Sequence, residues 1–241
     1  MGIAQWALGC YERYLDGEGE VWLDAARQAG DYLVAEQSAA GGWYEEHAHP
    51  HTFVVRAPWL SGMAQGQCVS VLVRLFLESG EAHFAESAAR GLRPMARPIA
   101  EGGVRSYLAG SPILEEYPTD PPSHVLNGAI FALWGYYDAW RGLEETEAGK
   151  GFRDCLGTLS ENGHRWDTGS WSRYDLYPHP IINVASPFYH ALHIDQLRAT
   201  DTLVPTTEIA TLAGNFEAYA ASHRNRIEAL TRKVAFRLRV R

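Results

Sequence analysis

One segment of the sequence recurs at an interval of about 62 residues, and this repeat limits the fold more than any other feature. The copies begin at Ser61, Ser123 and Ser186, which lie 62 and 63 residues apart. A serine suits a helix N-cap, because its hydroxyl accepts a hydrogen bond from an otherwise unpaired amide of the first turn. The repeat therefore predicts three equivalent helices, each capped by its serine.

The predicted helices fall into two classes. Residues 69–75 and 129–134 are almost wholly apolar, which is typical of helices buried on every side. Residues 81–95, between them, carry a single apolar stripe, which indicates a helix with one face in solvent. The N-terminal region repeats the scheme, with residues 3–15 as a candidate inner helix and residues 20–37 as an amphipathic outer one.

This alternation predicts an all-α fold, because an inner helix needs a complete apolar shell. We expect an (α/α) toroid, or incomplete barrel, of about four inner–outer helix pairs. Loops rich in glycine and aromatic residues follow the outer helices, and they predict short β-hairpin-like segments at one rim. Residues 1–241 are expected to form a single domain with a basic helical tail from about residue 223.

Composition excludes several classes of protein. The formal net charge of −8 argues against general nucleic-acid binding, which depends on a basic surface. The sequence shows neither a membrane span nor a signal-peptide pattern, so we expect a soluble protein, cytoplasmic or of unknown location. Cys10, Cys68 and Cys155 show no paired spacing, which favours buried free thiols. Residues 45–51 combine glutamate and histidine with proline, and we predict no metal there and no cofactor.

Parallel inner helices would bring their N-termini, and the loops that enter them, to one rim of the barrel. Polar side chains of the first helical turns would then face a shared cavity; these are Gln65, Gln67, Asn127, His190 and His193. Helix N-termini carry unpaired amides and a partial positive charge, which suits a ligand with a carboxylate. The rim is therefore the expected binding site.

Two loops that lead into this rim carry acid–base side chains. One reads EEYP at residues 115–118, and the other reads WSRYDL at residues 171–176. Tyrosine is a weak base at its ordinary pKa of about 10, but a nearby arginine favours the phenolate. Arg173 could act in this way on Tyr174, or it could hold a substrate carboxylate instead. The prolines that follow Tyr117 stiffen the first loop, which indicates a shaped site.

Three motifs carry a resemblance to a known family. WLSGMAQGQCVSVLVRLF, EEYPTDPPSHVLNGAIFALWGYYD, and WSRYDL followed by YHALHIDQL resemble the C-terminal domain of the D-glucuronyl C5-epimerases over about residues 59–197. The resemblance implies a helical barrel that converts glucuronate into iduronate within heparan-sulfate-type polymers, by removing and replacing the C5 proton. The family's motif tyrosines fall on Tyr117, Tyr174 and Tyr189, and its motif glutamate falls on Glu116.

The resemblance predicts a uronic-acid C5-epimerase whose partner is a uronate-containing polysaccharide or oligosaccharide. Such a proton exchange requires no redox cofactor. The expected catalytic residues are Tyr117, Tyr174, Tyr189, Glu116 and Arg173. The expected substrate-binding residues are Asn127, His190, His193, Arg105, Gln65, Gln67, Glu115 and Asn183.

Other functions stay open at this point. A polysaccharide lyase would share the abstraction of the C5 proton, and a hydrolase would need two carboxylates, for which only Glu115 or Glu116 with Asp175 is available. A non-catalytic glycan-binding domain is the alternative outside enzymes. Animal members of the family carry β-rich domains before the helical one; the sequence has no room for them ahead of residue 3, so we expect either a fragment or a minimal version of the family. Whether the chain forms a homodimer is also left open.

Overall fold

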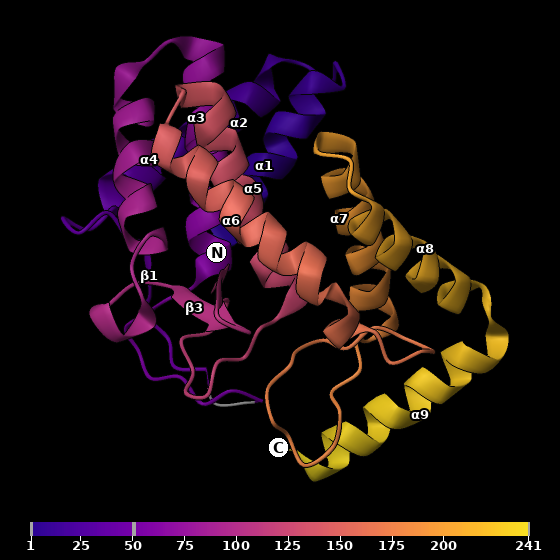
Figure 1. Ribbon diagram of the computed structural model, residues 1–241. Helices are drawn as coiled ribbons and strands as arrows, with labels where there is room; N and C mark the ends of the chain where they lie inside the picture. Colours follow the sequence, from indigo (N-terminus) through magenta and orange to yellow (C-terminus); the bar gives the residue numbers. More distant parts are fainter. Residues whose placement is uncertain (1, 50–51, 241) are drawn as a thin grey trace.

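Helices make up most of the chain and follow one another in pairs (Figure 1). The computed structural model describes residues 2–49 and 52–240. The pairs are α1 (Gly2–Leu15) with α2 (Glu20–Glu36), α3 (Gly62–Ser79) with α4 (Ala82–Met95), α5 (Leu126–Leu143) with α6 (Thr146–Asn162), and α7 (Pro187–Leu203) with α8 (Thr207–Ala221). A further helix, α9 (His223–Arg239), follows them. The prediction of an all-α fold is confirmed.

The first helix of each pair lies in an inner row and the second in an outer row. α3 packs against α1 and α5, and α5 also packs against α7. Each inner helix packs against the helix that follows it in the chain, so that α2, α4, α6 and α8 cover the outside. α3 is buried on nearly every side from Gly62 to Val73, whereas α4 buries one face that includes Phe84 and Ala88. The predicted inner and outer helices are thus confirmed.

Glycines let the inner helices α3 and α5 approach each other closely. A Cβ atom on Gly66 of α3 would lie 2.5 Å from the Cα atom of Ala132 in α5, which no folded chain tolerates without a shift. Gly135 of α5 meets the backbone of Gly66 in the same way, at 2.5 Å. These glycines let two apolar helices approach until their backbones touch, which fixes α5 against α3.

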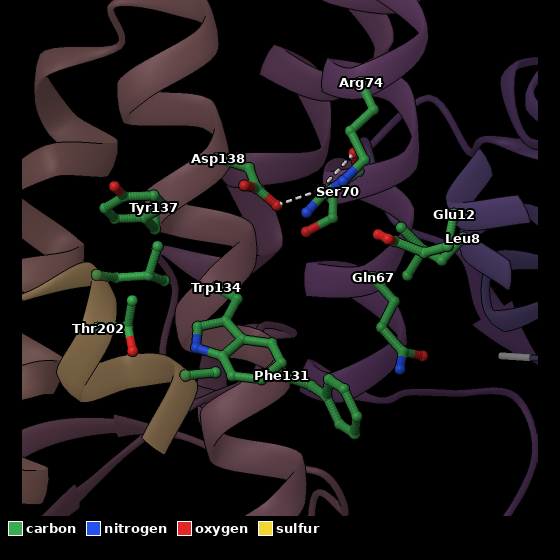
Figure 2. A pocket seen from close by; sticks show the side chains of 12 residues that line it. Leu8, Glu12, Gln67, Ser70, Arg74, Phe131, Trp134, Tyr137, Asp138 and Thr202 are labelled. Carbon is green, nitrogen blue, oxygen red and sulfur yellow. Dashed lines mark hydrogen bonds and ion pairs between the residues drawn. The ribbon is translucent and has the colours of Figure 1, made fainter. Parts of the chain in front are cut away.

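A cavity of about 440 Å³ lies between the four inner helices (Figure 2). Its lining comes from α1, α3, α5 and α7, and it includes the Arg74–Asp138 ion pair and the rings of Phe131 and Trp134. Gln67, which was expected at the rim, lines this cavity instead (Figure 2). None of the motif tyrosines lines this cavity.

Two of the three predicted serine caps are confirmed. The Ser61 hydroxyl accepts a hydrogen bond from the amide of Ala64, and the Ser186 hydroxyl accepts one from the amide of Tyr189, both at 3.3 Å. The third prediction was wrong, because α5 begins at Leu126 with Val125 in the N-cap position. The Ser123 hydroxyl donates to the carboxylate of Glu115 instead, at 2.9 Å, since this buried anion competes for the hydroxyl.

Short strands occupy the rim, as predicted. β3 (Arg105–Leu108) and β4 (Ser111–Leu114) form an antiparallel hairpin, and β1 (Tyr44–Glu45) pairs with β2 (Trp59–Leu60). Two 3₁₀ turns, η1 (Ile99–Glu101) and η2 (Gly163–Trp166), precede rim loops. The residue after β4 is Glu115, whose amide donates to Val104 and whose carbonyl accepts from Gly62. The hairpin and the start of α3 thus hold the EEYP segment between them.

The structure also bears on the predictions about the cysteines and about membrane-spanning helices. Cys10, Cys68 and Cys155 are buried and free, as predicted. Within residues 2–49 and 52–240, no helix has the length and apolar character that a membrane crossing requires.

Candidate active site

The three motif tyrosines line one pocket of about 250 Å³. Tyr117 comes from the loop after β4, Tyr174 from the loop between η2 and α7, and Tyr189 from the first turn of α7. The remaining lining residues are His49, Thr52, Phe53, Asn183, Ser186, Lys233, Phe236, Arg237 and Val240. Segments far apart in the sequence therefore meet at the rim, as the repeat predicted.

Backbone hydrogen bonds hold the loop of Tyr174 against two other elements. The amide of Tyr174 donates to the carbonyl of Asn183 at 2.8 Å, and its carbonyl accepts from the amide of Leu126 at 3.1 Å. The second bond uses an amide at the start of α5 that has no partner within the helix. The position of Tyr174 is thus tied directly to an inner helix.

Aromatic rings enclose Tyr117. Its ring stacks on Trp59 with a centroid distance of 5.6 Å, and it lies 4.9 Å from Phe53 and 4.8 Å from His49. Such contacts favour one ring orientation. The hydroxyl of Tyr117 is therefore presented in a defined direction, and the water around it is limited.

Glu116 lies behind Tyr117 and is almost fully buried. Burial raises the pKa of its carboxyl to about 7, although hydrogen bonds from Tyr117 and Asn127 act in the other direction. Asn127 Nδ2 lies 3.4 Å from Glu116 Oε2. A carboxyl with a pKa near 7 can both take up and return a proton at neutral pH, as general acid–base chemistry requires.

Glu116 and the three tyrosines form a chain of neighbouring acid–base groups. Tyr117 interacts with Glu116 and with Tyr174, and the ring of Tyr174 lies 4.9 Å from that of Tyr189, centroid to centroid. Burial is the largest cause that raises the pKa of all three phenols, and the charge of Glu116 adds to it. The tyrosines are therefore neutral in the resting protein, and Glu116 is the group of this chain that ionises most readily.

Comparison with known proteins places this chain in a family. The model of the D-glucuronyl C5-epimerase C-terminus matches residues 20–218. The chain belongs to this family. A D-glucuronyl C5-epimerase of Caenorhabditis elegans is 35% identical over a region that covers 70% of this chain and 30% of that protein. The chain thus spans less than a third of the length of this curated relative.

The fold has a counterpart among solved structures. The crystal structure of an unsaturated glucuronyl hydrolase specific for heparin superimposes with a TM-score of 0.61 over 95% of this chain and 72% of that one. The two chains are 12% identical, so this likeness concerns the fold alone. It confirms the (α/α) toroid that the repeat predicted.

The family's motif tyrosines and glutamate thus meet in one place in this chain, but Arg173 does not join them. Its Nε atom donates to the carbonyl of Asp175 at 3.1 Å, and burial lowers the pKa of the guanidinium. Arg173 is absent from the lining of the tyrosine pocket and from the groups that shift the pKa of Tyr174. The expectation that Arg173 favours a Tyr174 phenolate finds no support in this geometry.

Glu115, one residue before Glu116, lies in a very different environment. It is fully buried, and its carboxylate accepts hydrogen bonds from Ser106 at 2.5 Å and Ser123 at 2.9 Å. Nδ1 of His124 lies 2.5 Å from the same carboxylate. Burial alone would raise the pKa of Glu115, but the hydrogen bonds from His124 and Ser106 outweigh it and lower the pKa. This glutamate stabilises the loop and has no free lone pair directed at the pocket.

The two histidines expected at the rim are also engaged internally. Ser172 Oγ lies 2.7 Å from His190 Nδ1 and 2.9 Å from His193 Nδ1, and the other nitrogen of His190 contacts the carbonyl of Phe216. Burial lowers the pKa of His190 to about 4 and that of His193 to about 3. Both rings are therefore neutral at pH 7 and supply no positive charge to an anionic ligand.

Two other expected ligands lie elsewhere. The side chain of Gln65 exchanges hydrogen bonds with the backbone of Trp43, at 2.8 and 3.1 Å. Arg105 lines a separate surface pocket with Tyr136, and its guanidinium lies 5.9 Å from the ring of Tyr107. Gln65 shows that a polar side chain of a first helical turn can bind the backbone of a neighbouring element instead of facing the site. The spacing of residues in the sequence does not reveal such a contact.

Asn183 is the predicted binding residue that does line the tyrosine pocket. Its amide nitrogen donates to Asp175 at 2.5 Å, and its amide oxygen accepts from Lys233 Nζ at 2.7 Å. Lys233 and Arg237 of α9 are pocket residues that the sequence reasoning missed. Ala229 and Phe236, seven residues apart, are buried on α9 and were the available signal that this basic helix docks against the rim.

Metal binding was not expected, and the described residues contain no group of three His, Cys, Asp or Glu side chains placed to hold an ion. Within the run at residues 45–51, Pro50 and His51 lie outside the described residues.

Proposed function

We propose that the chain is a uronic-acid C5-epimerase that converts D-glucuronate residues into L-iduronate in a heparosan- or heparan-type glycan, or in another uronate-containing glycan. The observation that carries this proposal is that Tyr117, Tyr174 and Tyr189 line one pocket, with the carboxyl of Glu116 next to Tyr117. Family membership supports it, because the matching model describes a C5-epimerase domain.

The proposed reaction begins with removal of the C5 proton. This proton is only weakly acidic, so a base must be placed beside it and the adjacent carboxylate must be neutralised. Glu116 accepts the proton of the Tyr117 hydroxyl, and the Tyr117 oxygen takes the C5 proton from one face of the sugar. Tyr189 then donates a proton to the opposite face, which inverts C5.

The same chain restores the starting state. After inversion Tyr189 lacks a proton and Glu116 holds one extra. A shift of protons along the hydroxyls, from Glu116 through Tyr117 and Tyr174 to Tyr189, returns every group to its original form. The reaction therefore balances without an external acid, base or oxidant, and Tyr174 serves as the link between the two reacting tyrosines.

Product analysis tests this proposal against its rivals. The chain should be incubated with a heparosan-type polymer, and the uronate composition, the chain length and the ultraviolet absorbance should be measured. Formation of iduronate in polymer of unchanged length is the expected result. Absorbing unsaturated ends would indicate a lyase, new reducing ends a hydrolase, and binding without any product a glycan-binding domain. The hydrolase has the least structural support, because Asp175 is fully buried and bonded to Asn183.

The rate of exchange at C5 should rise with pH through a limb near pH 7. The carboxylate form of Glu116 acts as the base, and its pKa is raised to about 7, so the fraction of protein that carries this carboxylate grows by about tenfold between pH 6 and pH 8. The rate of deuterium incorporation should be measured across this range, with circular dichroism as a control for folding. A limb near pH 4.5, or none, would show that Glu116 does not act as this base.

Alanine at position 128 should disturb the site without removing any acid–base group. A Cβ atom on Gly128 would lie 2.4 Å from Glu116 Oε2 and 2.5 Å from Glu116 Cβ, so the glutamate must move. Because a displacement of about 1 Å can cost about a hundredfold in rate, Gly128→Ala should lower exchange by roughly 10- to 100-fold. Gly157→Ala is the matched control, since nothing lies within 4 Å of a Cβ there. Equal rates in the two variants would contradict the placement of Glu116.

A further inference from the structure

α9 lies outside the part of the chain that the family model matches. That match covers residues 20–218, whereas α9 spans His223–Arg239. Lys233, Phe236 and Arg237 of this helix nevertheless line the pocket of the three tyrosines. The pocket is therefore completed by a segment that the shared family region does not include.

α9 is docked against the rim through apolar contacts. Ala229 belongs to a buried cluster that includes Trp171 and Val184. The rings of Phe236 and His179 are nearly perpendicular, with their centroids 4.9 Å apart. The C-terminal half of the helix lies beside the loop that carries Tyr174 (Figure 1). This packing holds the helix in a defined position over the pocket.

Lys233 is the side chain of α9 that reaches the acid–base groups. Its Nζ atom donates to Asn183 Oδ1 at 2.7 Å and lies 5.4 Å from the ring centre of Tyr174. An ammonium group has three donors, and the neutral amide of Asn183 satisfies only one of them. Among the described lining residues of the pocket there is no aspartate or glutamate. The carboxylate of Asp175 also acts on Lys233, but it is fully buried behind Asn183 and does not line the pocket. The positive charge of Lys233 thus faces the pocket without an anion in the described lining.

The proposed reaction requires a charge of this kind. Negative charge develops on the sugar carboxylate as the C5 proton leaves, and a fixed cation beside it stabilises the transition state. The cations expected from the sequence do not meet this need, because Arg105 lies elsewhere and His190 is neutral. Lys233 retains its proton at neutral pH, although burial, followed by the charge of Arg237, lowers its pKa to about 8.

We propose that Lys233, with Arg237 beside it, binds the carboxylate of the uronate whose C5 proton is exchanged. α9 therefore supplies the electrostatic half of the active site, while the family region supplies the acid–base half. This inference rests on the proposed epimerase function and names the group that recognises its substrate.

Variants of Lys233 test the inference. Lys233→Met removes the charge and keeps the length of the side chain, so kcat/KM for C5 exchange on a heparosan-type polymer should fall by about 10- to 100-fold. Lys233→Arg should recover a large part of that loss. Arg226→Met is the matched control, because Arg226 is an exposed cation of the same helix that is absent from the pocket lining. Its kcat/KM should equal that of the wild type.

A binding measurement separates recognition from stability. The affinity for a uronate oligosaccharide should be measured by calorimetry in the Tyr117→Phe background, with and without Lys233→Met, and thermal unfolding should be followed in each variant. Loss of affinity without loss of folding is expected. Wild-type exchange that Lys233→Met leaves unchanged would overturn this inference alone. Absence of exchange in the wild type would overturn the proposed function, and the inference with it.

Discussion

Replacement of Tyr117 by phenylalanine is expected to lower the rate of C5 exchange by about 10²- to 10⁴-fold, the usual contribution of a positioned acid–base group. The substitution keeps the ring contacts with Trp59 and Phe53 but removes the hydroxyl that interacts with Glu116 and Tyr174. The variant should therefore fold normally and still bind the polymer. The measurement is the initial rate of deuterium incorporation at C5.

Tyr107→Phe is the control for this variant. Tyr107 lies on β3 with 52% of its surface exposed, outside the lining of the tyrosine pocket. The same chemical change at this position should leave the rate unaltered. A Tyr117→Phe rate within a few-fold of the control would show that the hydroxyl chain does not carry the proton.

Replacement of Glu115 by glutamine is expected to destabilise the fold by about 3 kcal/mol, because loss of a buried charged acceptor leaves its hydrogen-bond donors unpaired. Glutamine keeps the shape of the side chain but turns an amide group toward the donors of Ser106, Ser123 and His124. For a domain of this size, the fall in Tm should be on the order of 10 °C. Thermal unfolding at pH 8 measures it.

Glu116→Gln is expected to have the opposite effect on stability, because the pKa values of Glu115 and Glu116 are shifted in opposite directions. The pKa of Glu115 is lowered in the folded state, so its stabilising effect is present above the unfolded value of about 4.5 and is lost as the pH falls through the folded value. The pKa of Glu116 is raised to about 7, so its effect is stabilising below about pH 4.5 and is lost as the pH rises toward 7. At pH 8, Glu116→Gln should leave the Tm unchanged or raise it. Similar destabilisation by both changes would contradict the two environments.

The sequence predicted the architecture because a repeat of amphipathic and wholly apolar segments has few ways to bury its surface. The positions of Ser61 and Ser186 correctly predicted the starts of two inner helices. Because Tyr189 lies in the first turn of the second of these helices, its place at the rim followed from the same prediction. The third start was displaced to Leu126, since a hydroxyl that can cap a helix can also bind a buried carboxylate. Spacing does not distinguish these two uses of a serine.

The residues of the candidate site were also predicted only in part. The tyrosines and Glu116 were found from motifs, whose residue types suit acid–base chemistry. The cationic residues of the site were not found from motifs, because the charge and contacts of a side chain depend on how other elements pack against it. Burial lowers the pKa values of His190 and His193, so both rings are neutral at pH 7. Lys233 reaches the pocket because apolar contacts dock the basic helix α9 against the rim.

The central claim is that the chain of hydroxyls exchanges the C5 proton of a uronate. The most direct test is incubation of the wild-type chain with a heparosan-type polymer in deuterated water, followed by nuclear magnetic resonance of the recovered uronates. The account predicts deuterium at C5 of both glucuronate and iduronate residues, since either epimer can re-enter the reaction. Recovery of polymer that had bound the protein, with hydrogen retained at every C5, would contradict it.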